Sequence, residues 1–176
     1  PQVIIVYRDG VDDGMLDVVR ETEVRPLLKG LSEEFGENKF SLLYFVINKR
    51  IGERFYEMNH SGELVNPRSG TFIFEKVTKT DSFDFFMVGP SVKPELGSAR
   101  PVYFNALYNN TNLKLETIIE LTNYQCYTYY NWQGTLKVPA VCMLAQKLGV
   151  LNGQTTIGPR VKIADKAPLS DKPYYI

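Results

Sequence analysis

An aspartate at the end of an apolar run is the first residue in this sequence whose type and position could do chemistry. Asp9 follows residues 3–7 (VIIVY) after a single arginine, and it precedes Gly10. A strand end is rigid enough to aim a carboxylate into a site, but an aspartate before a glycine is also typical of a turn or a helix cap. The residues alone leave both interpretations of Asp9 open.

Four cations in or beside predicted loops could contact backbone phosphates: Arg50, Arg54, Arg100 and Lys137. Phosphate contacts position a nucleic-acid strand without reading its sequence. Lys137 also stands just before Pro139, the predicted start of a helix, and a helix N-terminus favours a bound anion. For each cation taken alone, a solvated surface charge is the alternative.

Aromatic residues gather near one predicted helix end, at Tyr127, Tyr129, Tyr130 and Trp132. They could stack on bases, as in single-strand binders, but aromatic residues on a helix that leads into a turn are more often part of the core, so we expect packing. His60, the sole histidine, lies in a polar segment and is predicted to be a loop residue. No other segment resembles a metal cluster, a nucleophile elbow or a nucleotide-binding glycine loop.

The composition predicts one compact intracellular domain. The chain has 176 residues, of which 44% are hydrophobic and 23% charged, and this argues against disorder. Lys+Arg and Asp+Glu both number 20, so any phosphate-binding patch must be local. Cys126 and Cys142 are too few for a disulfide scaffold and predict buried free thiols.

Neither a membrane span nor a signal peptide is evident. No apolar run reaches the roughly 20 residues that a spanning helix needs, and the N-terminus lacks a secretory pattern. We therefore expect a soluble chain without a membrane partner. It begins with Pro1 and enters an apolar strand at once, and we interpret it as a fragment.

The elements that must position these residues follow from apolar patterning. Residues 3–7 form a short β-branched run, which predicts a central strand covered on both faces. A turn at 12–14 precedes a long helix, in which Pro26 predicts a kink. Its expected apolar face is Met15, Val18, Val19, Thr22, Leu27, Leu28 and Leu31.

The remaining chain predicts further strands and two closing helices. The strand candidates are residues 41–48, 54–58, 71–77, 83–88 and 101–108, and the helices span residues 115–126 and 139–148. Residues 59–69 and 89–100 are predicted to be long loops, and the apolar end at 174–176 predicts a docked terminus. This order predicts a mixed α/β layered domain.

Several blocks of the sequence resemble a known family. Residues 4–15 (IIVYRDGVDDGM) resemble the strand and turn that carry the second catalytic aspartate of PIWI domains. Residues 130–148 (YNWQGTLKVPAVCMLAQKL) resemble the helix, turn and helix near the PIWI C-terminus, in the animal-type Piwi branch. Between them, the blocks SGTFIFEKV, DFFMV, SARPVYFNALY and LETIIELTNYQCYTYY follow in the family's order. The resemblance covers nearly the whole chain.

The resemblance implies a fold and a chemistry. Residues 1–176 would be the C-terminal part of a PIWI domain, an RNase H-like mixed sheet flanked by helices and incomplete because N-terminal strands are missing. In that family, carboxylates hold two Mg²⁺ or Mn²⁺ ions that drive in-line cleavage at a phosphate. Asp9 would be one metal ligand, the other Asp and Glu of the tetrad would lie upstream, and Gln146 occupies the fourth position, usually His and sometimes Lys or Asp. A glutamine cannot exchange a proton near neutral pH as histidine can.

The resemblance also implies the partners. Arg50, Arg54 and Arg100 match guide-phosphate contacts of the family, while Lys137 is a candidate from its position before a helix. The C-terminal carboxylate of Ile176 would complete the guide 5′-phosphate pocket with the neighbouring MID domain; a docked tail with an exposed carboxylate is the alternative. The partners are thus a piRNA-like small guide RNA, its target RNA, and the MID domain and N-terminal part of the same protein.

Three functions remain open from the sequence. The leading one is a small-RNA-guided gene-silencing protein that binds guide and target without efficient cleavage, in either cytoplasm or nucleus. The first alternative is an active endoribonuclease that tolerates Gln146. The second is a protein-interaction scaffold that no longer binds RNA.

Overall fold

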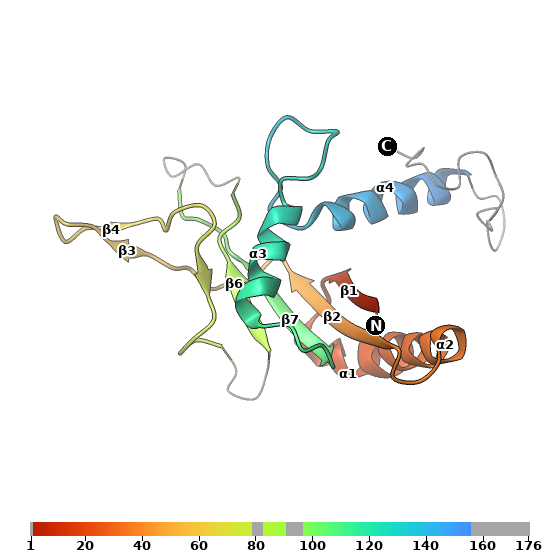
Figure 1. Cartoon of the computed structure of the whole chain (residues 1–176). Helices are drawn as coiled ribbons and strands as arrows, with labels where there is room; N and C mark the ends of the chain where they lie inside the picture. The colour runs from red at the N-terminus through yellow and green to blue at the C-terminus, as the bar shows by residue number, and fades with distance from the viewer. Residues whose placement is uncertain (1, 79–82, 91–96, 156–176) are drawn as a thin grey trace.

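A five-stranded mixed sheet forms the centre of the computed structural model, which describes residues 2–78, 83–90 and 97–155 (Figure 1). The strand order is β1-β2-β7-β6-β5, with β1 parallel to β2 and the other neighbours antiparallel. The strands are β1 (Gln2–Asp9), β2 (Phe40–Asn48), β5 (Phe72–Ile73), β6 (Asp84–Met87) and β7 (Val102–Asn109). The predicted mixed α/β class is confirmed.

Helices cover both faces of this sheet. Nearly all residues of β2 are apolar, so this strand presents an apolar surface to each face of the sheet. Phe45 and its alternates pack with α3 (Leu115–Gln125) and with Cys142 of α4 (Ala140–Thr155). Tyr44 and Val46 pack on the opposite face with the helix that follows β1. In Figure 1, α3 crosses in front of β6 and β7, while α1 and α2 lie below β1 and β2.

Strand β1 is an edge strand among the described residues, which corrects the prediction of a central strand. Both of its faces are covered as predicted, since Ile5 and Tyr7 pack on one side and Val6 packs on the other. The strand pairs with β2 alone, Val3 is 49% exposed, and the rest of the strand is half-buried or exposed. An apolar β-branched run reports a preference for burial, but it does not specify which neighbours provide that burial.

The helix after β1 runs from residue 13 to residue 35 with a π turn in its middle. It comprises η1 (Asp13–Met15), α1 (Leu16–Val19), the π turn η2 (Arg20–Val24) and α2 (Arg25–Phe35). The ring of Pro26 cannot donate the usual bond to the carbonyl of residue 22 and would clash with it; instead the Arg25 N–H reaches back five residues to the Arg20 carbonyl. The irregularity predicted at Pro26 is therefore a wide turn placed just before it.

That π turn also changes which side chains are buried. Val19 and Val24, five residues apart, are 3% and 1% exposed, whereas Met15 and Val18 are 47% and 45% exposed. The predicted apolar face assumed a uniform period of 3.6 residues, and an inserted π turn shifts the phase. Val24 was missed for this reason.

The other elements follow the predictions, but β3 (Glu57–Met58), β5 and β6 are shorter than the predicted strands. A separate hairpin of β3 and β4 (Leu64–Val65) extends to the left in Figure 1 and carries the exposed His60 in its turn. Strand β4 lies inside a segment predicted to be loop. Residues 91–96 of the second predicted loop, and the predicted docked terminus, lie outside the described residues.

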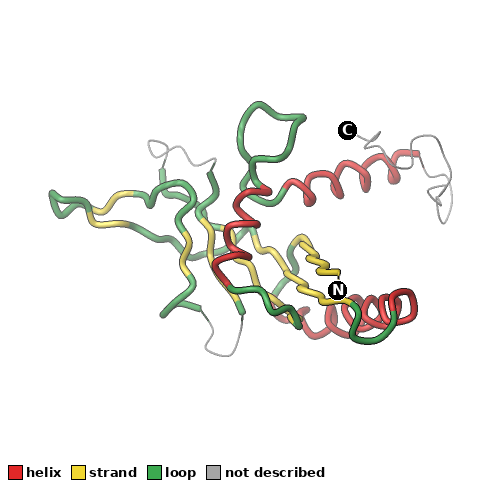
Figure 2. Tube along the Cα trace, in the orientation of Figure 1, coloured by secondary structure: helices red, strands yellow, loops and turns green. Residues whose placement is uncertain are grey.

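The aromatic segment corrects another prediction. Only Tyr129 is buried, at 7% exposure, while Tyr127, Tyr130 and Trp132 are 55%, 69% and 64% exposed. Helix α3 ends at Gln125, so these residues lie in the long loop before α4 (Figure 2), where no helical face directs them inward.

Both cysteines are free, as predicted: Cys126 is fully buried and Cys142 is half-buried. Within the described ranges, no helix has the length and apolar character needed to cross a membrane.

Candidate functional site

The end of β1 is held firmly against the core. Ile5 and Tyr7 pack into the core that contains α3, with the Tyr7 ring stacked on Phe45 at a centroid distance of 5.9 Å. The Tyr7 hydroxyl lies 2.8 Å from the Thr122 hydroxyl of α3, and burial raises the pKa of Tyr7 to about 12. Because side chains alternate along a strand, Asp9 emerges on the same side of the sheet as Ile5 and Tyr7.

Helix α4 lies on that same side. The Cys142 sulfur is 3.9 Å from the Tyr7 carbonyl oxygen, to which its S–H donates. Burial raises the pKa of the Cys142 thiol to about 12, and the negative charge of Asp9 adds to this shift. Gln146 follows four residues later, exposed, on the face of α4 that carries Cys142. The structure thus brings the end of β1 and the Gln146 helix to one side of the sheet.

The Asp9 carboxylate has two partners. Its Oδ1 accepts a hydrogen bond of 2.9 Å from the Gly10 backbone N–H, and its Oδ2 lies 2.6 Å from Lys49 Nζ. The two side chains of this ion pair are 60% and 44% exposed. Lys49 was not among the residues predicted from the sequence; the available signal was that Asp9 and Lys49 both follow apolar runs, whose ends meet if the two strands are parallel neighbours.

An open pocket of about 540 Å³ surrounds the ends of β1 and β2. Asp9 and Arg50 both line it, so two of the residues predicted from the sequence are brought together there. The other lining residues are Gly10, Val11, Asp12, Asp13, Ile47, Asn48, Lys49, Ile51 and Glu53. The pocket therefore offers cations and carboxylates side by side.

Gly10 is needed where the chain leaves β1. A Cβ on Gly10 would lie 2.5 Å from Asn48 Oδ1 and 2.7 Å from the Ile47 carbonyl oxygen. The absence of a side chain lets the turn after Asp9 press against the end of β2.

The other predicted phosphate contacts lie in other segments. Arg54 is half-buried and donates to the Ile51 and Glu53 carbonyls of its own loop, at 2.9 and 2.6 Å. Arg100 is exposed beside β7. Lys137 is exposed before α4, and its Cα is only 3.0 Å from where a Cβ of Gly89 would be. Ile176 lies outside the described residues.

The described residues do not by themselves fit a pair of metal ions. In this part of the chain, no three His, Cys, Asp or Glu side chains are grouped to hold a metal. Asp9 offers one carboxylate, already paired with an ammonium, and two-metal catalysis at phosphates requires several acidic ligands.

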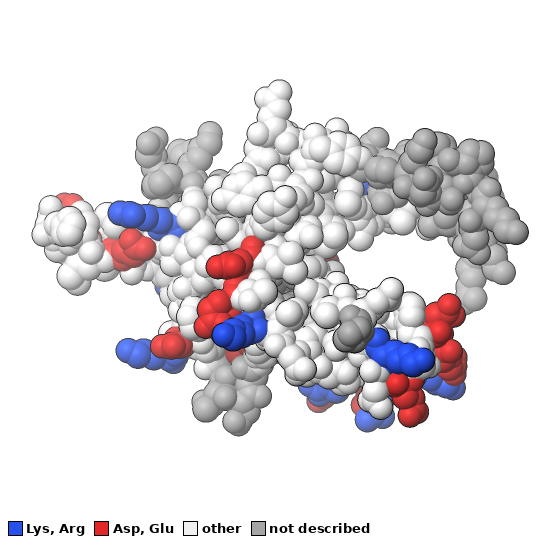
Figure 3. All heavy atoms as spheres, viewed as in Figure 1, with Lys and Arg blue, Asp and Glu red and all other residues white. Residues whose placement is uncertain are grey.

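Charges of both signs occur in several small groups on the face shown in Figure 3, including one over α2 and one near the β3–β4 hairpin. This distribution agrees with the equal numbers of 20 basic and 20 acidic residues. A phosphate-binding surface would therefore have to be local, as the sequence predicted.

The mixed sheet flanked by helices, with Asp9 at the end of its first strand, has the arrangement of an RNase H-like fold. The chain belongs to the Piwi domain family, whose model matches residues 1–156. It is similar to Piwi-like protein 1 of Danio rerio, with 39% identity over 155 residues, which are 88% of this chain and 18% of that protein. It is also similar to Protein piwi of Drosophila melanogaster, with 34% identity over 179 residues, covering 100% of this chain and 20% of that protein.

Solved structures agree with this family. The crystal structure of Drosophila Piwi superimposes with a TM-score of 0.73 at 35% identity, over 86% of this chain and 20% of that one. The structure of Kluyveromyces polysporus Argonaute with a guide RNA gives a TM-score of 0.69 at 25% identity, over 85% and 18% of the two chains. The predicted PIWI resemblance and its Piwi branch are confirmed, and the chain spans about a fifth of the length of these relatives.

Proposed function

We propose that this chain is part of a small-RNA-guided gene-silencing protein that acts inside the cell, binds a guide RNA and its target, and cleaves the target poorly or not at all. The observation that carries the proposal is the pocket at the ends of β1 and β2, where Asp9 lies beside Lys49 and Arg50 in a Piwi domain. Kluyveromyces polysporus Argonaute, whose structure is similar to this one, was crystallised with a guide RNA.

Phosphate binding follows from the exposed cations. Lys49 and Arg50 line the pocket, and both side chains are accessible to a polyanion. Arg100 and Lys137, each exposed, are proposed as further contacts along the guide, and Arg54 as a residue that orders the 51–54 loop while it reaches the RNA. The Ile176 carboxylate is proposed as a contact near the guide 5′-phosphate, together with the MID domain.

Poor cleavage follows from Gln146. When bound, Mg²⁺ or Mn²⁺ would activate a water and stabilise the leaving oxygen. Asp9 would supply one carboxylate ligand to that site. Gln146 can offer a carbonyl oxygen but cannot carry a proton to or from the reacting atoms.

Cleavage of a fully paired RNA target separates the proposal from an active nuclease. The full-length protein, loaded with a guide, is incubated with target in Mg²⁺ and in Mn²⁺, with Asp9→Asn as control. We expect tight target binding and little product, unchanged in Asp9→Asn. Product that disappears in Asp9→Asn would establish the nuclease instead.

Recovery of the protein from cells addresses the remaining alternative, a scaffold without RNA. We expect small RNAs to co-purify with the protein, and fewer of them with a Lys49→Gln/Arg50→Gln variant. Protein that is folded but free of small RNA would overturn the guide-binding proposal.

A further inference from the structure

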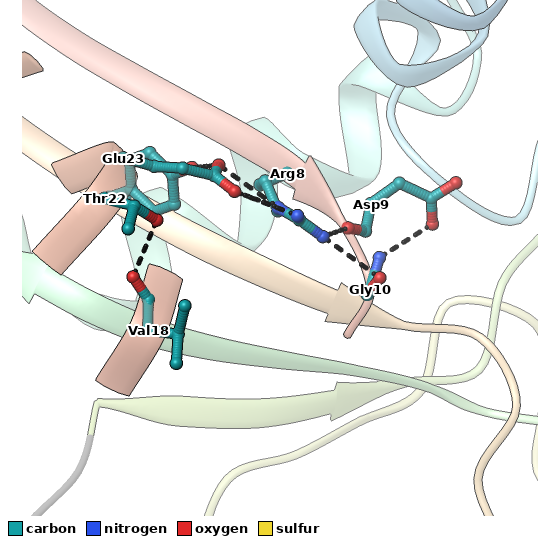
Figure 4. A network of polar contacts seen from close by, with 7 residues as sticks. Arg8, Asp9, Gly10, Val18, Thr22 and Glu23 are labelled. Atoms are coloured by element: carbon teal, nitrogen blue, oxygen red, sulfur yellow. Dashed lines mark hydrogen bonds and ion pairs between the residues drawn. The ribbon is translucent and has the colours of Figure 1, made fainter. Parts of the chain in front are cut away.

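A chain of polar contacts holds the turn after Asp9 from the opposite side of the sheet (Figure 4). The guanidinium of Arg8 donates from Nη1 to the Asp9 carbonyl at 2.5 Å and to the Gly10 carbonyl at 3.1 Å. The same group donates from Nη2 to Glu23 Oε1 at 2.9 Å and from Nε to both carboxylate oxygens at 3.3 Å. Arg8 thus joins the Asp9–Gly10 backbone to the helix that follows β1.

Glu23 is anchored in turn by the core. The Tyr44 hydroxyl of β2 donates to Glu23 Oε2 at 2.6 Å, and Tyr44 is only 3% exposed. The hydrogen bond with Arg8, followed by that with Tyr44, holds the pKa of Glu23 below its usual value. Glu23 therefore has a fixed position between a buried tyrosine and an arginine.

The π turn carries Glu23. Residues 20–24 form this wide turn, which ends two residues before Pro26, and Thr22 Oγ1 donates to the Val18 carbonyl of α1 at 2.7 Å. Inserting one residue per turn rotates all later side chains around the helix axis, and such single π turns often occur at functional sites. The backbone irregularity caused by Pro26 thus belongs to the segment that presents Glu23 to Arg8.

We propose that Arg8 and Glu23 are positioning residues that lock the Asp9–Gly10 turn, so that the Asp9 carboxylate is presented to the pocket in one orientation. The inference rests on the proposed role of Asp9 in the site. Two features separate this arrangement from an ordinary surface ion pair, which contributes little. First, the planar guanidinium binds the backbone carbonyls of Asp9 and Gly10 as well as the Glu23 carboxylate. Second, Gly10 packs so closely against the end of β2 that a side chain there would clash with Ile47 and Asn48.

Hydrogen–deuterium exchange of the segment around residues 8–12 in the full-length protein tests the proposal without any need for cleavage. The variants are Glu23→Gln, which keeps the size of the side chain but loses its charge, and Arg8→Lys, which keeps the charge but loses the planar guanidinium that binds several acceptors at once. Glu21→Gln is the matched control, because Glu21 also lies in the π turn and pairs with an arginine, Arg25, at 2.6 Å, and this ion pair is separate from the contacts of Arg8 with the turn after Asp9. Tyr44→Phe is a milder variant that removes only the anchor of Glu23.

We expect about tenfold faster exchange in this segment for Glu23→Gln and Arg8→Lys, the factor for a loss of about 1.4 kcal/mol in local opening free energy. The double variant should exchange no faster than either single variant, since both break one chain of contacts. Glu21→Gln should match the parent protein, and Tyr44→Phe should give a smaller increase.

Two outcomes would overturn the proposal. One is exchange in Glu23→Gln equal to that in Glu21→Gln; the other is faster exchange spread over the whole sheet, which would make the contact merely structural. A protein that binds no RNA would refute the proposed function and leave the exchange result standing. Where cleavage is measurable, the turnover rate should fall in Arg8→Lys while guide and target affinities stay the same.

Discussion

Asp9 and Lys49 form an exposed ion pair that can open at little energetic cost. With both side chains about half exposed, the Asp9–Lys49 contact is held in a high-dielectric environment, where such pairs contribute only about 0–1 kcal/mol. Lys49 can therefore leave Asp9 for a phosphate without a large loss of stability. The backbone of the turn is, by contrast, tied to Arg8 and pressed against β2.

The close approach of Gly10 to β2 predicts a specific intolerance. Gly10→Ala places a methyl group 2.5 Å from Asn48 Oδ1 and 2.7 Å from the Ile47 carbonyl, so the turn must move. We expect a loss of about 1–3 kcal/mol in local stability, in the range for overpacked sites, measured by hydrogen exchange of β1. Gly14→Ala is the control, since among the described residues no atom beyond its own neighbouring backbone lies within 4 Å of the position that its methyl group would take. Equal effects of the two substitutions would contradict the steric argument.

The lowered pKa of Glu23 predicts a pH dependence. Because the folded-state pKa lies below the usual carboxyl value, the stabilisation by Glu23 is complete above that usual value and is lost as pH falls through the folded-state pKa. The difference in β1 protection between the parent protein and Glu23→Gln should thus be largest near pH 7 and shrink toward about pH 3. A difference that stays constant over this range would count against the ionised Arg8–Glu23 contact.

At the scale of elements, β1 is fastened by a different polar contact on each face. On one face Arg8 reaches Glu23 of the π turn, and on the other Tyr7 meets Thr122 of α3. The Thr122 hydroxyl also donates to the Ile118 carbonyl at 2.7 Å, which leaves the Tyr7 O–H to donate to Thr122. Helices on both sides therefore hold the strand that ends in Asp9.

The Tyr7–Thr122 contact predicts coupled mutations. Thr122→Val leaves the half-buried Tyr7 hydroxyl without its acceptor and should cost about 1 kcal/mol in protection of β1. Adding Tyr7→Phe removes the hydroxyl that has lost its acceptor, so the double variant should lose less protection of β1 than the sum of the losses in the two single variants. Strict additivity, measured by the same exchange experiment, would show that the two hydroxyls do not interact.

At the scale of the whole molecule, the sheet has an open side. Strand β1 pairs only with β2 in the part of the chain that the structure describes, and the residues at its two ends, Gln2, Val3 and Asp9, are exposed. An apolar edge strand with free N–H and C=O groups is a template for pairing with other chains. The relatives are about five times as long, so most of their length lies beyond the region matched here.

The open edge predicts poor folding in isolation. A polypeptide restricted to these 176 residues should aggregate or melt without cooperativity, because β1 lacks a second neighbour among the described strands. Thermal unfolding followed by circular dichroism, together with size-exclusion chromatography, measures this. A monomer with a single cooperative transition would contradict the prediction.

Local patterns in the sequence were enough for the layer class, the buried strand β2, both closing helices and the place of Asp9 at a strand end. Each of these depends on apolar periodicity or on the order of short motifs, which neighbouring residues express directly. The same motifs indicated the Piwi family, since several blocks in one order are specific even when each block is short.

Only the tertiary structure decided which residues meet Asp9. Lys49 is 40 positions away and Glu23 acts through Arg8, and both depend on parallel strand pairing and on a π turn that a uniform helical period does not predict. Burial was likewise undetermined for Tyr127, Tyr130 and Trp132, because the end of α3 decides whether they face the core or solvent. Long-range pairing and helix phase are collective properties of the packed chain, so no local window of sequence contains them.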